Sequence, residues 1–130
     1  MIHVMDSSAI LAILRGEPGC DYVQEMLQSE ECAISSVNMA EVGSKLIDYG
    51  LPPEEFPRIA RQLQIDIVDF NTDQCIQSAQ IRKITRSVGL SLGDRACVAL
   101  TQLMKGCVVT SDRAWLDIAE TTKIKVLMIR

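Results

Sequence analysis

The stretch Met1-Ile-His-Val-Met-Asp6-Ser-Ser-Ala9 passes from a short apolar segment into a segment with helical periodicity, and an aspartate stands at the junction. The apolar residues 2–5 predict a buried strand, and residues 7–14 predict a helix because their aliphatic side chains recur on one face. An acid between a strand and the helix that follows it suggests a site at the end of that strand.

The rest of the chain repeats this alternation of strand and helix. Further strands are predicted over Cys32–Ser35, Ile65–Phe70, Cys107–Thr110 and Ile124–Ile129. Further helices are predicted over Asp21–Gln28, Val37–Tyr49, Pro53–Leu63, Thr72–Thr85, Ser91–Met104 and Arg113–Ala119. In the helix over residues 72–85, the predicted buried stripe is Cys75, Ile76, Ala79 and Ile84. This order favours an α/β fold in which about five parallel strands are covered by helices on both faces.

Length and composition limit the class of protein. A chain of 130 residues is expected to form one domain over residues 1–130 and to bury about two thirds of its unfolded surface without disulfides. The five cysteines are odd in number and include no C-x-x-C pair, which indicates reduced thiols. The net charge of −4 argues against a simple nucleic-acid-binding module, although a nuclease remains open because a cation neutralises clustered acids.

The N-terminus has no basic region ahead of an apolar stretch, so no signal peptide is expected. No apolar run approaches the roughly 18 residues of a membrane span. Together with the reduced cysteines, these features predict a cytoplasmic protein without a membrane partner.

Four acidic residues stand at or near predicted helix starts: Asp6, Glu41, Asp94 and Asp112. Each has a structural alternative, because acids cap helices and are favoured in first turns. Asn38-x-x-Glu41 and Ser91-x-x-Asp94 both have the capping-box form. Independent caps would scatter around a fold, whereas strand-to-helix junctions of a parallel sheet share one edge, where ligands bind. The joint pattern therefore predicts a shared site.

The chemistry of such a site follows from its ligands. Carboxylates in one cleft repel one another unless a cation is present, and Mg2+ and Mn2+ prefer carboxylate and water oxygens. A bound ion can polarise a phosphate and lower the pKa of an attacking water. The single histidine, His3, excludes a multi-histidine metal site. The four acids are therefore candidate metal ligands and catalytic residues for phosphodiester hydrolysis.

Several neighbours are candidates for supporting roles. Short hydroxyl or amide side chains that could orient a carboxylate or a metal-bound water belong to Ser7, or its neighbour Ser8, and to Asn38, Thr110 and Ser111. Helix capping is the alternative role for these residues.

Basic residues could contact a phosphate. Arg95 directly follows Asp94 in the sequence. Arg82, Lys83 and Arg86 form the densest basic group and could follow an RNA backbone, the alternative being a solvated helix face.

Four segments taken in order resemble the PIN-domain nucleases, and more closely the VapC-type toxins of bacterial toxin-antitoxin pairs. They are Val4-Met-Asp6-Ser-Ser-Ala-Ile-Leu-Ala12, Ser35-Ser-Val-Asn38-Met-Ala-Glu41-Val42, Leu90-Ser-Leu-Gly-Asp94-Arg-Ala-Cys-Val-Ala-Leu100 and Val109-Thr-Ser-Asp112-Arg-Ala-Trp115. The resemblance covers essentially the whole chain.

The resemblance implies a three-layer α/β/α sandwich and a Mg2+- or Mn2+-dependent endoribonuclease site formed by the same four acids. It also implies homodimers and inhibition by a small antitoxin that inserts a basic residue into the acidic cleft. PIN domains that process RNA without an antitoxin are one alternative. An aspartyl-phosphate phosphatase or receiver domain is another, but the phosphatase needs an aspartate two residues after Asp6, where Ser8 stands, and a receiver needs a clustered acid pair after the first strand. A non-catalytic binding module is a third alternative, which would be favoured if any of the four acids were absent.

Overall fold

The computed structural model describes residues 1–130 and contains one parallel sheet of five strands in the order β3-β2-β1-β4-β5. The strands are β1 (His3–Met5), β2 (Cys32–Ser35), β3 (Asp66–Val68), β4 (Cys107–Thr110) and β5 (Lys125–Met128). The predicted parallel sheet is confirmed. The third strand is shorter than predicted because it lies at the sheet edge and pairs only with residues 33–35 of β2.

Helices fill the connections between the strands. They are α1 (Ser7–Arg15), α2 (Cys20–Ser29), α3 (Ser36–Asp48), α4 (Phe56–Gln62), α5 (Thr72–Gln80), α6 (Arg82–Thr85), α7 (Leu92–Met104) and α8 (Ala119–Thr122). Single 3-10 turns occur as η1 (Pro53–Glu55), η2 (Arg86–Val88) and η3 (Arg113–Asp117). The predicted helix over 72–85 is therefore two helices that meet at the buried Ile81, and the one over 113–119 is η3 followed by α8. No helix is long and apolar enough to cross a membrane.

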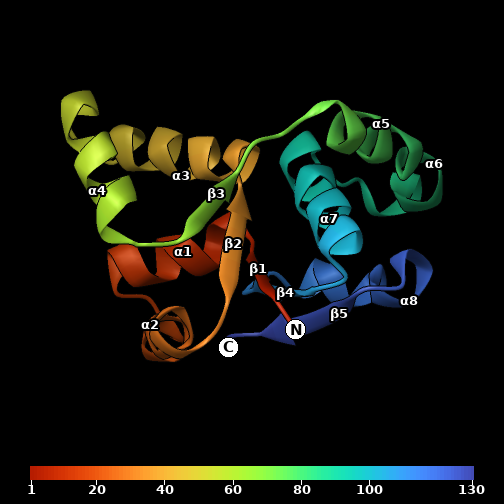
Figure 1. Ribbon diagram of the computed structural model, residues 1–130, viewed down its shortest axis with the longest axis horizontal. Coiled ribbons are helices and arrows are strands. Elements are labelled where there is room, and N and C mark those ends of the chain that lie inside the picture. Colours follow the sequence, from red (N-terminus) through yellow and green to blue (C-terminus); the bar gives the residue numbers. More distant parts are fainter.

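The sheet separates two apolar cores, which gives the predicted three-layer sandwich. Neighbouring residues of β1 point to opposite faces, as the two-residue period of a strand requires. Met5 belongs to the core under α1, α2 and α3, whereas Val4 belongs to the core that contains α7 residues and the fully buried Trp115. Figure 1 shows α1 to α4 on one side of the strands and α5 to α8 on the other.

The face of α5 and α6 that packs inward differs from the predicted one. The predicted stripe is wrong: Cys75, Ile76, Ala79 and Ile84 are exposed. The buried side chains of this segment are instead Gln74, Ser78, Ile81 and Thr85. Hydrogen bonds account for the inversion, since Gln77 Nε2 donates to Gln102 Oε1 at 2.6 Å and Gln74 Nε2 donates to the Asp69 carbonyl at 2.8 Å.

The strand order reverses between β1 and β4, because β2 and β3 lie on one side of β1 while β4 and β5 lie on the other. The connections leaving the carboxyl ends of β1 and β4 therefore diverge. In open parallel sheets, a crevice at such a reversal is where ligands bind. This is the edge at which Asp6 follows β1 and Asp112 follows β4.

Candidate metal centre

A pocket of about 200 Å³ lies at this edge and is lined entirely by polar and charged residues. The lining residues are Asp6, Ser7, Ser8, Glu41, Lys45, Ser91, Asp94 and Asp112. The structure thus brings together all four acids identified in the sequence, from the end of β1, from α3, from the first turn of α7 and from the segment after β4. A water molecule takes up about 30 Å³ in the liquid, so the pocket has room for an ion and several waters.

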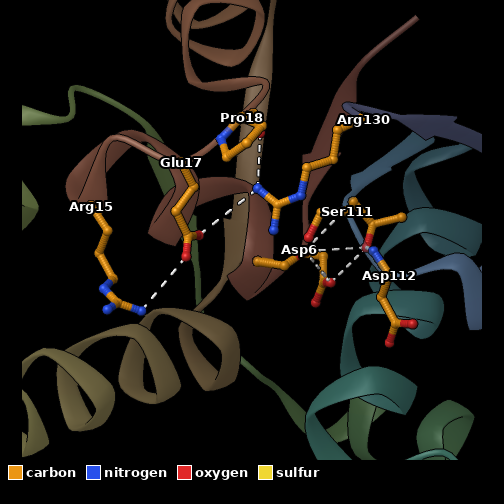
Figure 2. A network of polar contacts seen from close by, with 9 residues as sticks. Asp6, Arg15, Glu17, Pro18, Ser111, Asp112 and Arg130 are labelled. Carbon is orange, nitrogen blue, oxygen red and sulfur yellow. Dashed lines mark hydrogen bonds and ion pairs between the residues drawn. The ribbon is translucent and has the colours of Figure 1, made fainter.

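Asp6 is the most deeply placed of the four acids, at 6% exposure. Its Oδ1 accepts from the Ser7 N–H at 2.8 Å, and its Oδ2 accepts from the hydroxyls of Thr110 at 2.8 Å and Ser8 at 2.9 Å. Burial raises the pKa of Asp6 to about 6, with a contribution from the charge of Asp94, although these hydrogen bonds act in the opposite direction. Figure 2 shows Asp6 beside Ser111 and Asp112.

Glu41 is fixed by side chains from two helices, α1 and α3. Its Oε1 accepts from Ser7 Oγ at 2.8 Å and from Asn38 Nδ2 at 3.0 Å. The same Asn38 amide donates to the Gly93 carbonyl at 3.0 Å, which joins α3 to α7. The side chain of Asn38 is completely buried and its Oδ1 has no partner. Asn38 therefore positions Glu41 from beneath the pocket.

The capping box at Asn38-x-x-Glu41, the structural alternative to a role of Glu41 in the site, is not formed. Helix α3 begins at Ser36, and Ser35 is its cap, with Ser35 Oγ accepting from the Val37 N–H at 3.2 Å. Asn38 and Glu41 consequently lie inside the helix, where their three-residue spacing places them on one face. This placement removes the capping explanation for Glu41.

Asp94 and Asp112 each accept a backbone hydrogen bond at a helix start and also line the pocket. Asp94 Oδ2 accepts from the Ser91 N–H at 3.1 Å in the predicted capping box, and Asp112 Oδ1 accepts from the Ala114 N–H at 3.0 Å. Burial raises the pKa of Asp94, its hydrogen bonds to Ser91 lower it, and the charges of Glu41 and Asp112 raise it. A carboxylate has two oxygens, so capping with one leaves the other for a ligand.

Of the other candidate residues, Thr110 and Ser111 contact residues of the pocket, whereas Arg95 does not line it. Thr110 is buried and donates to Asp6, while Ser111 offers its backbone N–H to Ser8 Oγ at 3.0 Å. Arg95 does not line the pocket, because it lies one position further round α7 and its Nη1 donates to the Ser78 carbonyl of α5 at 3.0 Å.

The basic group Arg82, Lys83 and Arg86 is exposed on α6 and η2, outside the pocket lining. Arg82 Nη1 lies 3.5 Å from the Leu90 carbonyl, next to the pocket residue Ser91. This contact connects the basic group to the rim of the pocket.

Lys45 lines the pocket but was not foreseen from the sequence. It follows Glu41 by four residues on α3, a spacing that puts both on one helical face. This four-residue spacing was the sequence feature from which Lys45 could have been identified.

The donor set suits a hard divalent cation, although the carboxylates are not gathered around one point. No three acidic, histidine or cysteine side chains are placed closely enough to hold one ion. Three carboxylates nevertheless keep an oxygen that accepts no hydrogen bond, namely Glu41 Oε2, Asp94 Oδ1 and Asp112 Oδ2. All the acidic donors are oxygens, which is the ligand type that Mg2+ or Mn2+ prefers. Rotation of these side chains would direct the free oxygens toward one ion.

Fold and site together define an α/β protein with an acidic pocket at the reversal point of a parallel sheet. The family model of the PIN domain matches residues 4–121, and the chain belongs to the PIN domain family. This confirms the family predicted from the sequence and gives the coarse class of the protein, a hydrolase of the nuclease type.

Solved structures with similar folds include several bacterial complexes. DNA-bound VapBC from Salmonella typhimurium has a TM-score of 0.76 at 18% identity, with 100% of this chain and 99% of that chain covered. VapBC-1 from nontypeable Haemophilus influenzae gives 0.73 at 14% identity, covering 99% and 98%. FitAcB from Neisseria gonorrhoeae gives 0.71 at 20% identity, covering 99% and 98%. At these identities the similarity is one of fold. No curated protein sequence matches the chain.

Proposed function

We propose that this PIN domain is an endoribonuclease that uses Mg2+ or Mn2+ to hydrolyse RNA phosphodiester bonds. The observation that carries the proposal is the convergence of Asp6, Glu41, Asp94 and Asp112 on one polar pocket at the carboxyl edge of the sheet. These four acids are the proposed metal ligands and catalytic residues.

The supporting residues prepare the acids for this role. The bound ion would supply phosphate polarisation and a nucleophilic water at neutral pH. Thr110 links two ligands, since its hydroxyl donates to Asp6 Oδ2 and accepts from the Asp112 N–H at 3.0 Å. Ser7 and Asn38 similarly hold one oxygen of Glu41 and leave the other free. Part of the ligand set is thus held in place before the ion arrives, which limits the side-chain rotation that binding must fix.

Metal removal tests the proposal directly. Purified protein is expected to cleave single-stranded RNA in Mg2+ or Mn2+ and to lose cleavage completely in excess EDTA. Activity should return when either ion is added back beyond the chelator. Fragment release from an end-labelled RNA measures both steps, and cleavage that persists undiminished in EDTA contradicts the proposed mechanism.

We further propose that the chain is the toxin of a toxin-antitoxin pair. The support is the fold similarity to chains of VapBC and FitAB complexes, together with an acidic pocket that favours a cationic inhibitor. The proposed partners are RNA, a small antitoxin and a second copy of the chain, and the proposed location is the cytoplasm. The basic group Arg82, Lys83 and Arg86 is a proposed RNA contact, because it adjoins the loop that enters the pocket at Ser91.

An antitoxin is expected to inhibit by placing an arginine or lysine among the carboxylates, since a guanidinium stays charged and pairs with two carboxylate oxygens. Metal and antitoxin should then compete. In a complex with the product of a neighbouring open reading frame, rising Mn2+ is expected to restore RNA cleavage. Antitoxin variants with alanine at the basic tail residues should inhibit less, and unchanged inhibition by them would rule out direct occupation of the pocket. A PIN nuclease of RNA processing would yield no inhibitory partner in this experiment.

A further inference from the structure

A second, larger hollow runs along α3 beside the acidic pocket. It has a volume of about 590 Å³ and is lined by Ser36, Val37, Ala40, Glu41, Ser44 and Lys45. Two of these residues, Glu41 and Lys45, also line the acidic pocket. The two hollows therefore meet at α3. We call the larger one the α3 groove.

Lys45 is the one basic residue among those that line either hollow. Its side chain is exposed and forms no ion pair within 4.0 Å, since the ion pairs of the protein involve Arg15, Arg58 and Arg130. A helix pair with Glu41 four residues earlier is the simplest structural role for such a lysine. That pair is not formed, because the Glu41 carboxylate is directed to Ser7 and Asn38.

The charge of the site suggests a role for this unpaired lysine. Four carboxylates repel a phosphodiester, and one divalent ion offsets only part of their charge. A cation at the junction of the two hollows would attract the substrate phosphate without competing for the metal ligands. A lysine ammonium is a compact point charge that suits a single phosphate oxygen.

The α3 groove has room for the nucleotide attached to that phosphate. Its volume falls in the range of small-ligand sites, about 300–1,000 Å³. Its uncharged side chains are small, and Ser36 Oγ, which accepts from the Phe70 N–H at 3.0 Å, retains its own hydrogen to donate. The groove therefore combines space, a hydroxyl donor and a cation on one helix.

We propose that Lys45 binds the backbone phosphate of single-stranded RNA at the junction of the two hollows and that the α3 groove holds the nucleotide adjoining it. Lys45 is then a substrate-binding residue beside the metal ligands. The inference rests on the ribonuclease function proposed above and adds to it the path of the substrate.

The salt dependence of cleavage tests the proposal. Each phosphate contact with a single strand contributes about 0.7 to the slope of log affinity against log salt concentration. Lys45→Ala is expected to raise KM for a single-stranded RNA about tenfold at low salt, to change kcat little, and to reduce the slope of log(kcat/KM) by about 0.7. Lys45→Arg should keep most of the wild-type slope because the charge remains.

The matched control is Lys125→Ala, which removes an exposed lysine at the first residue of β5, on the opposite edge of the sheet. Its KM and salt slope should equal those of the wild type. Thermal unfolding of all variants checks that the fold is intact, as expected for exposed side chains.

The outcomes separate this inference from the proposed function. If the wild-type protein shows no metal-dependent cleavage, the ribonuclease proposal fails and the substrate path fails with it. If the wild-type protein cleaves but Lys45→Ala has the wild-type KM and slope, the substrate path alone is overturned. Faster cleavage by Lys45→Ala with tighter Mn2+ binding, measured by calorimetry, also overturns it, because Lys45 would then be an internal counter-ion.

Discussion

Asp6→Asn is expected to lower metal-dependent RNA cleavage by about a thousandfold or more while making the metal-free protein more stable at neutral pH. Loss of a carboxylate ligand removes several kcal/mol of metal-assisted stabilisation, and about 1.4 kcal/mol corresponds to each factor of ten in rate. The fold should survive because asparagine has the same shape as aspartate. Its amide can use the hydroxyls of Ser8 and Thr110, whose hydrogens are free to rotate.

The gain in stability follows from the sign of the pKa shift. The pKa of Asp6 is about 6 in the folded protein against its ordinary value of 3.8, so between these values the folded state binds more protons than the unfolded state. The contribution of Asp6 to the stability of the metal-free protein should therefore be fully present below pH 4, fall as the pH rises through 6, and then level off. The shift corresponds to about 3 kcal/mol at full ionisation, and Asp6→Asn should recover part of it at pH 7, on the order of 1 kcal/mol.

Urea unfolding of the metal-free proteins between pH 4 and 8 measures this effect. The wild-type free energy of unfolding should fall across the range, and that of Asp6→Asn should fall less. Asp66→Asn, at an exposed aspartate of β3, is the control and should follow the wild type in stability and cleavage. If Asp6→Asn loses stability at pH 7 and still cleaves RNA, Asp6 is only the cap of α1.

The sequence was sufficient to predict the sheet because its central strands are buried on both faces. Val4 and Met5 enter opposite cores, as do Val108 and Val109, so both strands appear as unbroken apolar runs. The convergence of Asp6 and Asp112 then follows from the parallel topology, since the ends of adjacent parallel strands share one edge.

The outer helices were harder to predict because their packing depends on partners distant in sequence. Gln77 of α5 donates to Gln102 of α7, which is 25 residues away in the sequence, and no local pattern contains that information. Helix α3 begins at Ser36, one residue before the predicted start at Val37. Serines at both 35 and 36 can cap a helix, so the local sequence does not determine which of them does. The sequence therefore left two roles open for Asn38, a helix cap or a support for Glu41, and in the structure its buried amide donates to Glu41 from inside α3.

Gly93→Ala is the second substitution with a large expected effect, because Gly93 lies against the carboxylate of Glu41. A Cβ built at Gly93 would overlap both oxygens of that carboxylate. Glu41 cannot yield without leaving Ser7 Oγ and Asn38 Nδ2, which hold its Oε1. Because Gly93 has no side chain, the Glu41 carboxylate can occupy its position in the pocket. Gly93 therefore determines the place of a proposed metal ligand as well as the approach of α3 to α7.

Gly93→Ala should lower kcat/KM for RNA cleavage about a hundredfold, the cost expected when a misplaced group disturbs catalytic geometry by about 1 Å. Calorimetric titration should also show weaker Mn2+ binding. A glycine-to-alanine change inside a helix with ordinary backbone angles usually stabilises a protein by about 0.4–1 kcal/mol. A variant that is stabilised by this amount and cleaves RNA normally would contradict the assigned role of Gly93.

The double variant Gly93→Ala with Glu41→Asp separates a displaced ligand from a general disturbance of α7. Aspartate is one methylene shorter, so its carboxylate would withdraw from the added methyl group while remaining in the pocket. Residues in contact are not additive, and a coupling energy of about 0.5–3 kcal/mol is expected between them. Loss of cleavage in the double variant should therefore be smaller than the product of the two single losses. A loss in the double variant equal to the product of the two single losses would mean that alanine at position 93 acts elsewhere. Partial recovery of both Mn2+ affinity and cleavage would assign its effect to the position of the Glu41 carboxylate.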